Sequence, residues 1–399
     1  MNFWDKEKKG THCRRTGASN PALGSVLIMH ESGIQREQEV RMKRTFPGAR
    51  IAAALLGFLG VIIACSCIGP ASAQSIDELY KAAKAEGGLV LYGGGPAALY
   101  EPWAREFEQR FPGIKVTVTA GFSNILAPQI DEKIRRKQLD VDLTIFQTLQ
   151  DYARWKNAGA LMSFKPESFD QIDPSFKDAD GQYVAVAIYG LSYAYNTEKV
   201  KKSQVPKSAL DFLKPEFAGQ TITCYPHDDD VTLYLYQTIV DKYGWEFMDR
   251  LKANHPAYVR GHLGVARSVS SGEKTLTFDT MANITLAEAR AGKPTAIAVS
   301  ETDPLPIWPQ TTAIFKDAPH PNAAKLYITW FLQKDTQARI GTWSPRADVP
   351  PPAGLKPLFS YNLANGFRAF ITQEETKLNA LRKRYESYTG PVAGTPTIR

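Results

Sequence analysis

The chain has 399 residues, of which 43% are hydrophobic and 22% are charged, and its formal net charge is +7. Residues 1–73 hold ten of the 48 Lys and Arg residues and five of the 41 Asp and Glu residues, so the remainder is close to neutral at +2. The sequence pI of about 9.0 therefore gives no support for nucleic-acid or anionic-membrane binding, and no basic tract with interleaved aromatic residues follows.

Residues 42–73 have the order of a secretory signal peptide. A basic stretch at 42–50 precedes an uninterrupted apolar run at 51–68, and Ala71-Ser72-Ala73 forms a small-x-small cleavage site. We therefore expect an exported, periplasmic protein that begins near Gln74, with residues 1–41 as a mis-assigned start or a disordered leader. An uncleaved membrane anchor and a lipoprotein acylated at Cys65 are the alternatives.

The cysteine count predicts a chain held together by an ordinary core. Cys13, Cys65 and Cys67 lie in or before the signal peptide, which leaves Cys224 alone in the mature chain, without an internal disulfide partner. Cys224 lies in an apolar strand pattern and is interpreted as a buried core thiol. The mature chain is long enough for two domains.

The first part of the mature chain alternates predicted strands and helices. Strands are expected at 88–92, 114–119 and 141–146, each followed by a helix, and the second helix has Ser123 or Asn124 as its expected N-cap. The third helix is expected at 149–157 and is closed by Gly159. This alternation predicts a mainly parallel sheet with helices on both faces.

The second part repeats this alternation after a long extended run. Residues 183–196 are β-prone and are the first candidate for a hinge crossing. Strands are then expected near 221–225, 257–260, 276–279 and 295–299, and helices from about Asp230, Val265 and Ile284. Pro304, Pro306 and Pro309 are interpreted as a stiff connector and as the return crossing, ahead of a strand at 311–315 and a helix at 322–333.

Six sequence blocks, in order, are similar to those of one family of proteins. They are LYG at 91–93, FEQRFPGIKV at 107–116, DVDL at 140–143, YGLSYAYNT at 189–197, DFLKPEFAG at 211–219 and APHPNAAKL at 318–326. Together they cover about residues 76–345, and the chain resembles an extracellular solute-binding protein of an ABC transporter, of the ferric-iron, phosphonate and thiamine receptor subgroup.

The resemblance implies a type II periplasmic-binding-protein fold, in the α/β class, with two lobes joined by two hinge crossings. We expect lobe I at 75–189, lobe II at 190–308, and the return to lobe I with the C-terminal helices at 309–399. It implies a monomer that closes over one small solute and delivers it to permease subunits at the inner membrane. Neither a cofactor nor a structural metal is implied. A periplasmic signalling partner in place of the permease is an alternative.

Loops at the carboxyl edges of the predicted sheets supply the candidate ligand-binding residues, because ligands of open α/β sheets bind there and helix N-termini attract anions. The candidates are Gly94, Gly95, Ser123, Asn124, Gln147, Thr148, Tyr189, His227, Asp228, Arg267, Ser268, Asp279, Thr280 and Glu301. Arg267 is the candidate for gripping a phosphonate, phosphate ester or carboxylate. We therefore expect an anionic organic solute.

A ferric solute is the principal alternative. Ferric receptors of this family bind iron with two adjacent tyrosines near the last strand of the second lobe, whereas the matching stretch here, 298–303, has none. Glu301 and Asp303 offer hard oxygen atoms, although acidic residues in a connector are more often solvated.

Other chemistry-bearing patterns have simpler interpretations. Residues 93–98 match the letters of a G-x-G-x-x-A nucleotide fingerprint, but the acid expected after the next strand is missing. The polar run at 224–230 suits a helix start better than a metal site. Tyr189, Tyr193 and Trp308 are candidates for aromatic walls of the cleft or for core positions. No G-x-S-x-G or H-E-x-x-H motif is present, so we expect a protein that is not an enzyme.

Overall fold

The computed structural model describes residues 74–397. The predicted leader, the signal peptide, its cleavage site and Cys65 lie outside the described residues. Across residues 74–397, none of the helices combines the length and the apolar content that crossing a membrane requires.

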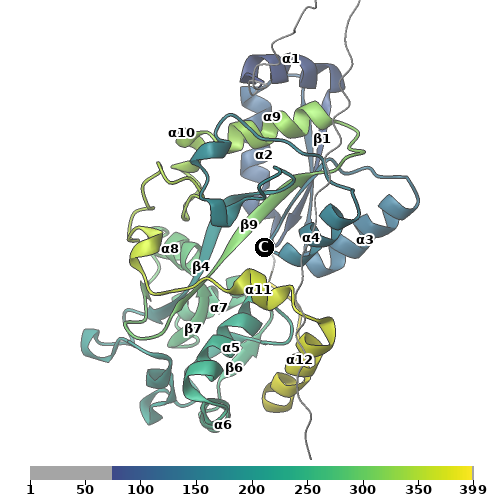
Figure 1. Ribbon diagram of the computed structural model, residues 1–399. Helices are drawn as coiled ribbons and strands as arrows, with labels where there is room; N and C mark the ends of the chain where they lie inside the picture. The colour runs from purple at the N-terminus through teal and green to yellow at the C-terminus, as the bar shows by residue number, and fades with distance from the viewer. Residues whose placement is uncertain (1–73, 398–399) are drawn as a thin grey trace, which may run out of the picture. The chain divides into compact units, whose positions relative to one another are not determined.

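The described residues form an α/β fold built on a mixed sheet (Figure 1). The strands are β1 (Gly88–Gly94), β2 (Lys115–Gly121), β3 (Leu143–Phe146), β4 (Val184–Asn196), β5 (Ile222–Cys224), β6 (Ala257–Val259), β7 (Leu276–Met281), β8 (Thr295–Ala298), β9 (Leu305–Ile314) and β10 (Leu363–Ala364). The α-helices are α1 (Ile76–Glu86), α2 (Glu101–Arg110), α3 (Ser123–Arg135), α4 (Leu149–Asn157), α5 (Asp230–Tyr243), α6 (Glu246–Ala253), α7 (His262–Ser270), α8 (Ala282–Arg290), α9 (Pro321–Phe331), α10 (Lys334–Gln337), α11 (Phe367–Ile371) and α12 (Glu375–Thr389).

The main sheet has the order β2-β1-β3-β9-β4-β7, with parallel strands at the β2 end, and β5 and β6 form a separate two-stranded sheet. β1 pairs in parallel with β2 and β3, and β5 pairs in parallel with β6. β9 runs antiparallel to β3 and β4, and β4 continues antiparallel to β7 and β8. The predicted α/β fold is confirmed, but the main sheet is mixed and not mainly parallel as expected, because β4 runs antiparallel to β7, β8 and β9, and β9 runs antiparallel to β3 while pairing in parallel with β10.

Strand β9 corrects one expectation. The proline-marked segment was predicted to be a connector, but Pro306 and Pro309 lie within β9, opposite Ala364 and Ile188. Proline lacks an N–H and is tolerated in sheets mainly at edges and irregular positions. The register of β4 against β9 shifts between Ala185 and Ala187, close to Pro309, which is such a position.

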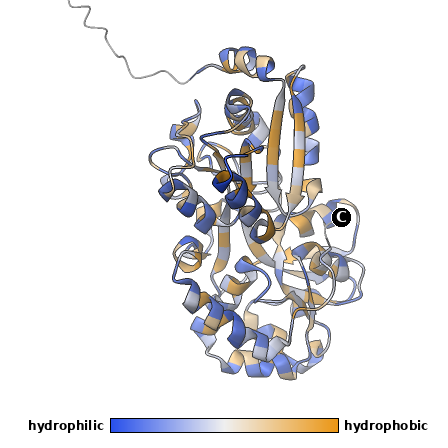
Figure 2. Ribbon diagram, turned by 90° about the vertical axis from the view of Figure 1, so that its right-hand side faces the viewer, coloured by the Kyte–Doolittle hydropathy of each residue, from blue (hydrophilic) through white to orange (hydrophobic). Residues whose placement is uncertain are grey.

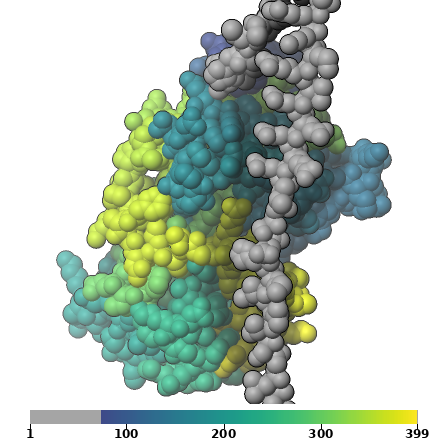
Figure 3. All heavy atoms as spheres, in the orientation of Figure 1, coloured from purple at the N-terminus to yellow at the C-terminus, as the bar shows by residue number. Residues whose placement is uncertain are grey.

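Two groups of buried side chains provide most of the core. One joins β1, β2 and β3 to α1, α2 and α9, and it includes Phe107, Phe111, Tyr327 and Trp330. The other joins β4 and β7 to α5, α6, α11 and α12. Figure 2 shows hydrophobic residues concentrated along the strands, with hydrophilic residues on the outer helices. In Figure 3 the C-terminal residues, in yellow, adjoin both the teal and the green parts of the surface.

The C-terminal helices pack on the central part of the chain. Phe367, Ile371, Leu378 and Tyr385 lie in the same buried cluster as Tyr236 of α5. The lobe boundaries given above stay a prediction.

We expect Phe107→Ala to lower the free energy of unfolding by about 3–5 kcal/mol, because Phe107 is fully buried and its ring packs on those of Phe111 and Tyr327 at 4.9 and 5.1 Å. The matched control is Phe359→Ala, which makes the same chemical change at a side chain that is 64% exposed. Urea unfolding of both variants measures the difference. Equal losses at the two positions would contradict this account of the core.

Candidate functional site

A cleft of about 310 Å³ lies where the ends of several strands and the beginnings of several helices meet. One wall is formed by the end of β1, the residue before α3 and Gln147 after β3. The opposite wall is formed by the starts of α5, α7 and α8. Tyr189 of β4 and Trp308 and Gln310 of β9 also line it. The cleft thus lies at the strand ends, where the rule for open α/β sheets places ligands.

The N-cap residues of four helices line this cleft. They are Phe122 before α3, Asp229 before α5, Gly261 before α7 and Met281 before α8. Only Asp229 caps its helix with its side chain, by accepting hydrogen bonds from the N–H groups of Val231 and Thr232 at 2.9 Å. The other three helices begin without a side-chain cap. The first-turn N–H groups of these three helices therefore lie near the cleft without a capping side chain as hydrogen-bond acceptor.

The glycine loop after β1 is held closely by polar side chains. Tyr100 Oη donates a hydrogen bond to the carbonyl oxygen of Gly94 at 2.5 Å, and Gln310 Nε2 donates to Tyr100 Oη at 2.9 Å. A Cβ atom on Gly94 would lie 2.7 Å from Gln147 Oε1, and Gly95 has a φ of +109°. Glycine is required at both positions, so backbone atoms of the loop can approach a ligand closely.

Apolar and aromatic side chains cover much of the cleft surface. The rings of Tyr189 and Trp308 lie 5.9 Å apart and are tilted by 42°. Burial raises the pKa of Tyr189 to about 12, so its phenol stays protonated at neutral pH. The other apolar lining residues are Pro96, Ala98, Leu99, Phe122, Val231, Leu263, Met281, Ile284 and Ala287. A bound solute would therefore contact apolar surface as well as polar groups.

His262, the first residue of α7, lies between the cleft and a buried carboxylate. Its Nε2 atom is 3.1 Å from Asp279 Oδ1 and 3.3 Å from Thr232 Oγ1, and Asp279 is fully buried. Burial alone would lower the pKa of His262, but the buried Asp279 carboxylate at 3.1 Å helps to raise it above its ordinary value. Pairing with Asp279 therefore favours the protonated form of the imidazole.

Five of the predicted binding residues line the cleft: Gly94, Gly95, Gln147, Tyr189 and Arg267. Two more lie one layer behind it. Ser123 Oγ donates a hydrogen bond to Gln147 Oε1 at 3.0 Å, and Asp279 holds His262. Ser123 is the first residue of α3 and does not cap it, which corrects the expected N-cap: Phe122 holds that position.

Seven predicted residues do not line the cleft. Asn124 is exposed, and Thr148 is buried beside α4. Asp228 forms a two-point ion pair with Arg260, at 2.7 and 3.0 Å. Three others have local partners: His227 lies 3.5 Å from Thr389 Oγ1, Ser268 donates to Glu273, and Glu301 forms an exposed ion pair with Lys207. The last, Thr280, is buried in β7 opposite Ser192 of β4.

Two details of the helix starts account for part of this difference. Helix α5 starts at Asp230 as predicted, but its N-cap Asp229, and not the preceding Asp228, reaches the cleft. Helix α7 starts at His262, three residues earlier than predicted, so His262 was left in a loop. The glycine at position 261 was the available sequence signal for that start, and in the structure it has a φ of +86°. Asn283 and Gln310 were also missed. Of the three aromatic candidates, Tyr189 and Trp308 line the cleft, and Tyr193 donates a hydrogen bond to Asp303 instead.

Comparisons with known proteins agree with this architecture. Residues 103–359, more than half of the chain, match the family of bacterial extracellular solute-binding proteins. An Fe(3+)-binding periplasmic protein of Serratia marcescens is 26% identical over 215 residues, which cover 52% of this chain and 62% of that relative. The chain thus spans less than two thirds of that relative's length.

Solved structures share the fold. Iron-bound HitA from Pseudomonas aeruginosa matches with a TM-score of 0.62 and 20% identity, over 75% of this chain and 99% of that one. The periplasmic binding protein AfuA from Actinobacillus pleuropneumoniae, with fructose-6-phosphate bound, matches with a TM-score of 0.61 and 20% identity, over 76% of this chain and 98% of that one. At these identities the likeness shows the fold alone.

The raised pKa of His262 gives stability a defined dependence on pH. Protonated His262 stabilises the folded chain fully below its unfolded pKa of about 6.5, and this contribution is lost as the pH rises through the folded-state pKa. We expect His262→Gln to lower the free energy of unfolding by about 3–5 kcal/mol near pH 6, because Asp279 loses its charged partner, and by less at alkaline pH.

Urea unfolding between about pH 6 and pH 10 measures this difference. The control is His255→Asn, because His255 is exposed and has a φ of +51°, which Asn tolerates. A loss in His262→Gln that stays constant over the whole pH range would contradict the ion pair.

Proposed function

The chain belongs to the bacterial extracellular solute-binding protein family, and we propose that it captures a small anionic organic solute and delivers it to the permease of an ABC importer. The solute is a phosphonate, a phosphate ester or a carboxylate. Proteins of this family bind solutes and are not enzymes. The proposal concerns the solute and its delivery.

The convergence of four helix N-termini on one cleft carries this proposal. Each helix has at least nine residues and directs the positive end of its dipole to the same space, and α3, α7 and α8 add first-turn N–H groups that no side chain caps. A phosphate, phosphonate or carboxylate oxygen can accept hydrogen bonds from such groups, which is the common mode of anion binding at helix N-termini.

Charged side chains support the same choice. Arg267 lines the cleft from α7, and its guanidinium can bind an oxyanion through two parallel N–H donors. His262 adds a cationic imidazolium at the start of the same helix, although Asp279 balances its charge. Asp229 and Glu288 also line the cleft, but Asp229 caps α5 and Glu288 accepts a hydrogen bond from Ser270.

The apolar part of the cleft narrows the solute class further. Tyr189 and Trp308 on one side, and Leu263 and Ile284 on another, present surface that inorganic phosphate would not fill. We therefore expect an anionic head group on a small organic body.

A ferric solute is the second candidate, because the Serratia marcescens relative is an Fe(3+)-binding protein and HitA was solved with iron bound. Tyr189, Asp229 and Glu288 are oxygen donors in the cleft lining. Nothing in the lining repeats an adjacent tyrosine pair, so the anionic organic solute is preferred.

The test is a thermal-shift screen of the purified protein, produced from the full chain, against phosphonates, phosphate esters, carboxylates, sugars, thiamine and ferric citrate. A ligand at one hundred times its dissociation constant adds about 2.7 kcal/mol of stability, which raises the melting temperature measurably. We expect one anionic organic class to give the largest shift. A shift only with ferric citrate would overturn the choice of solute, and no shift with any compound would overturn the solute-capture proposal.

Two variants locate the binding site. Arg267→Gln is expected to weaken binding of the anionic ligand about tenfold or more, because it removes a charge-assisted hydrogen-bond donor from the cleft. Arg290→Gln, at the exposed far end of α8, is the matched control and should bind as the parent does. Tyr189→Phe removes only a phenol, so it should weaken ferric binding strongly and anionic organic binding little.

A further inference from the structure

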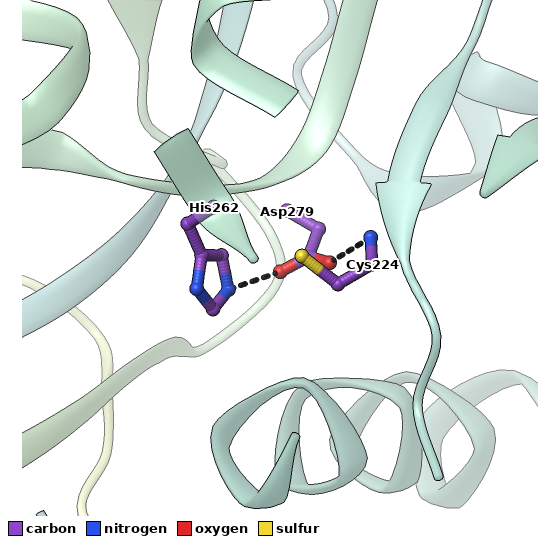
Figure 4. A group of neighbouring side chains, drawn as sticks. All are labelled: Cys224, His262 and Asp279. Atoms are coloured by element: carbon purple, nitrogen blue, oxygen red, sulfur yellow. Dashed lines mark hydrogen bonds and ion pairs between the residues drawn. The ribbon is translucent and has the colours of Figure 1, made fainter. Parts of the chain in front are cut away.

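Three side chains with metal-binding donor atoms meet beneath the cleft. They are Cys224 at the end of β5, His262 at the start of α7 and Asp279 in β7, and one donor atom of each lies within 4.8 Å of the other two. All three residues are buried. Figure 4 shows the His262 imidazole at the left of the Asp279 carboxylate, with the Cys224 sulfur overlapping the carboxylate in this view. Three separate elements therefore bring thiol, imidazole and carboxylate donors together.

Neighbouring groups fix the carboxylate in an orientation that suits a metal ligand. Asp279 Oδ2 accepts hydrogen bonds from the Cys224 N–H at 2.8 Å and from Thr223 Oγ1 at 2.9 Å. Its other oxygen, Oδ1, faces His262 Nε2 at 3.1 Å (Figure 4). Supporting hydrogen bonds of this kind orient the ligands of protein metal sites.

From this geometry we propose that Cys224, His262 and Asp279 bind a divalent transition-metal ion of the zinc type. Thiolate sulfur, imidazole nitrogen and carboxylate oxygen are the three donors that Zn²⁺ uses in proteins. In a tetrahedral site these donor atoms are about 3.3–3.8 Å apart. Side-chain rotations that move the donor atoms by about an ångström therefore bring the three together around an ion. This proposal goes beyond solute capture and does not rest on it.

The cleft gives an ion a route to this site. His262 lines the cleft, whereas Cys224 and Asp279 lie behind it. Three protein ligands leave the fourth position of a tetrahedral ion for water or for an anion, the arrangement typical of zinc sites with an open position.

Metal binding exchanges protons for the ion and involves no redox change. Burial raises the pKa of the Cys224 thiol to about 12, so this thiol is protonated before the metal arrives. The ion forms bonds to the sulfur and to the imidazole nitrogen, and the thiol proton leaves as the metal–sulfur bond forms.

The chain contains a second His–Asp pair, which differs from the proposed metal site in having no cysteine beside it. His320 Nδ1 lies 2.9 Å from Asp142 Oδ2, which is a second His–Asp pair, partly buried and formed without a cysteine. A His–Asp pair alone therefore serves as a structural contact in this fold. The thiol is the feature that distinguishes the cluster beneath the cleft.

The test uses metal alone, added to the purified untagged protein in the absence of solute. We expect one Co²⁺ per chain, with the near-ultraviolet absorption of a cobalt–thiolate bond, and displacement of the Co²⁺ by Zn²⁺. Cys224→Ser is expected to lose this absorption and to bind Zn²⁺ about tenfold or more weakly. His255→Asn, which removes an exposed imidazole, should bind as the parent does.

Far-UV circular dichroism checks that Cys224→Ser is folded, and a second measurement needs no variant. In weakly buffered solution at neutral pH, Zn²⁺ binding should release protons, because the thiol must lose its proton to bind the ion. Absence of the thiolate absorption in the parent protein, or Zn²⁺ binding unchanged in Cys224→Ser, would overturn the proposal. Neither result depends on the solute screen, so failure of one proposal is distinguishable from failure of the other.

Discussion

The antiparallel pairing of β4 with β9 is the constraint on which the rest of the site depends. β4 exchanges partners along its length, from β9 at residues 184–190 to β7 and β8 at residues 191–196. β9 in turn pairs with β3, so the parallel strands at one end connect through these two strands to β7. Tyr189, Trp308 and Gln310 line the cleft because they lie on this pair. Any change in its register would move all three together.

Secondary structure was predictable wherever the hydrophobic periodicity fitted only one kind of element, a helix or a strand. Helix α4 occupies residues 149–157 as predicted, and the β-prone run at 183–196 forms β4. The interpretation of residues 304–309 as a connector was wrong because proline in a sequence indicates a break, while β9 tolerates its prolines beside a register shift in β4. The local sequence of β9 carries no information about the register shift in its neighbour β4.

The candidate site was predictable as a set of loops, but not always as a set of residues. The carboxyl-edge rule identified the loops after β1 and β3 and the region of α7, and Gly94, Gln147 and Arg267 do line the cleft, as does Tyr189, which was a candidate for an aromatic wall. Within a loop, the residue that reaches the cleft depends on where the helix begins. Helix α5 begins where predicted, yet its N-cap Asp229 lines the cleft in place of the chosen Asp228, and a shift of three residues in the start of α7 brings in His262. Helix ends are the least predictable part of an element.

The buried cluster of Cys224, His262 and Asp279 lies behind the cleft, so a metal ion bound there can affect solute binding. Without metal, the imidazolium of His262 balances the Asp279 carboxylate, and the Cys224 thiol is neutral. With a divalent ion in place, two positive charges balance one thiolate and one carboxylate, and the imidazole is neutral. The net charge beneath the cleft is therefore zero in both states, so long-range attraction of an anion is the same.

The two states differ in coordination, because a bound ion offers a position to an oxygen donor. A solute whose oxygen reaches that position would bind more tightly with metal present, and by linkage would tighten the metal to the same degree. A solute held only by Arg267 and the helix N-termini would bind equally well in both states.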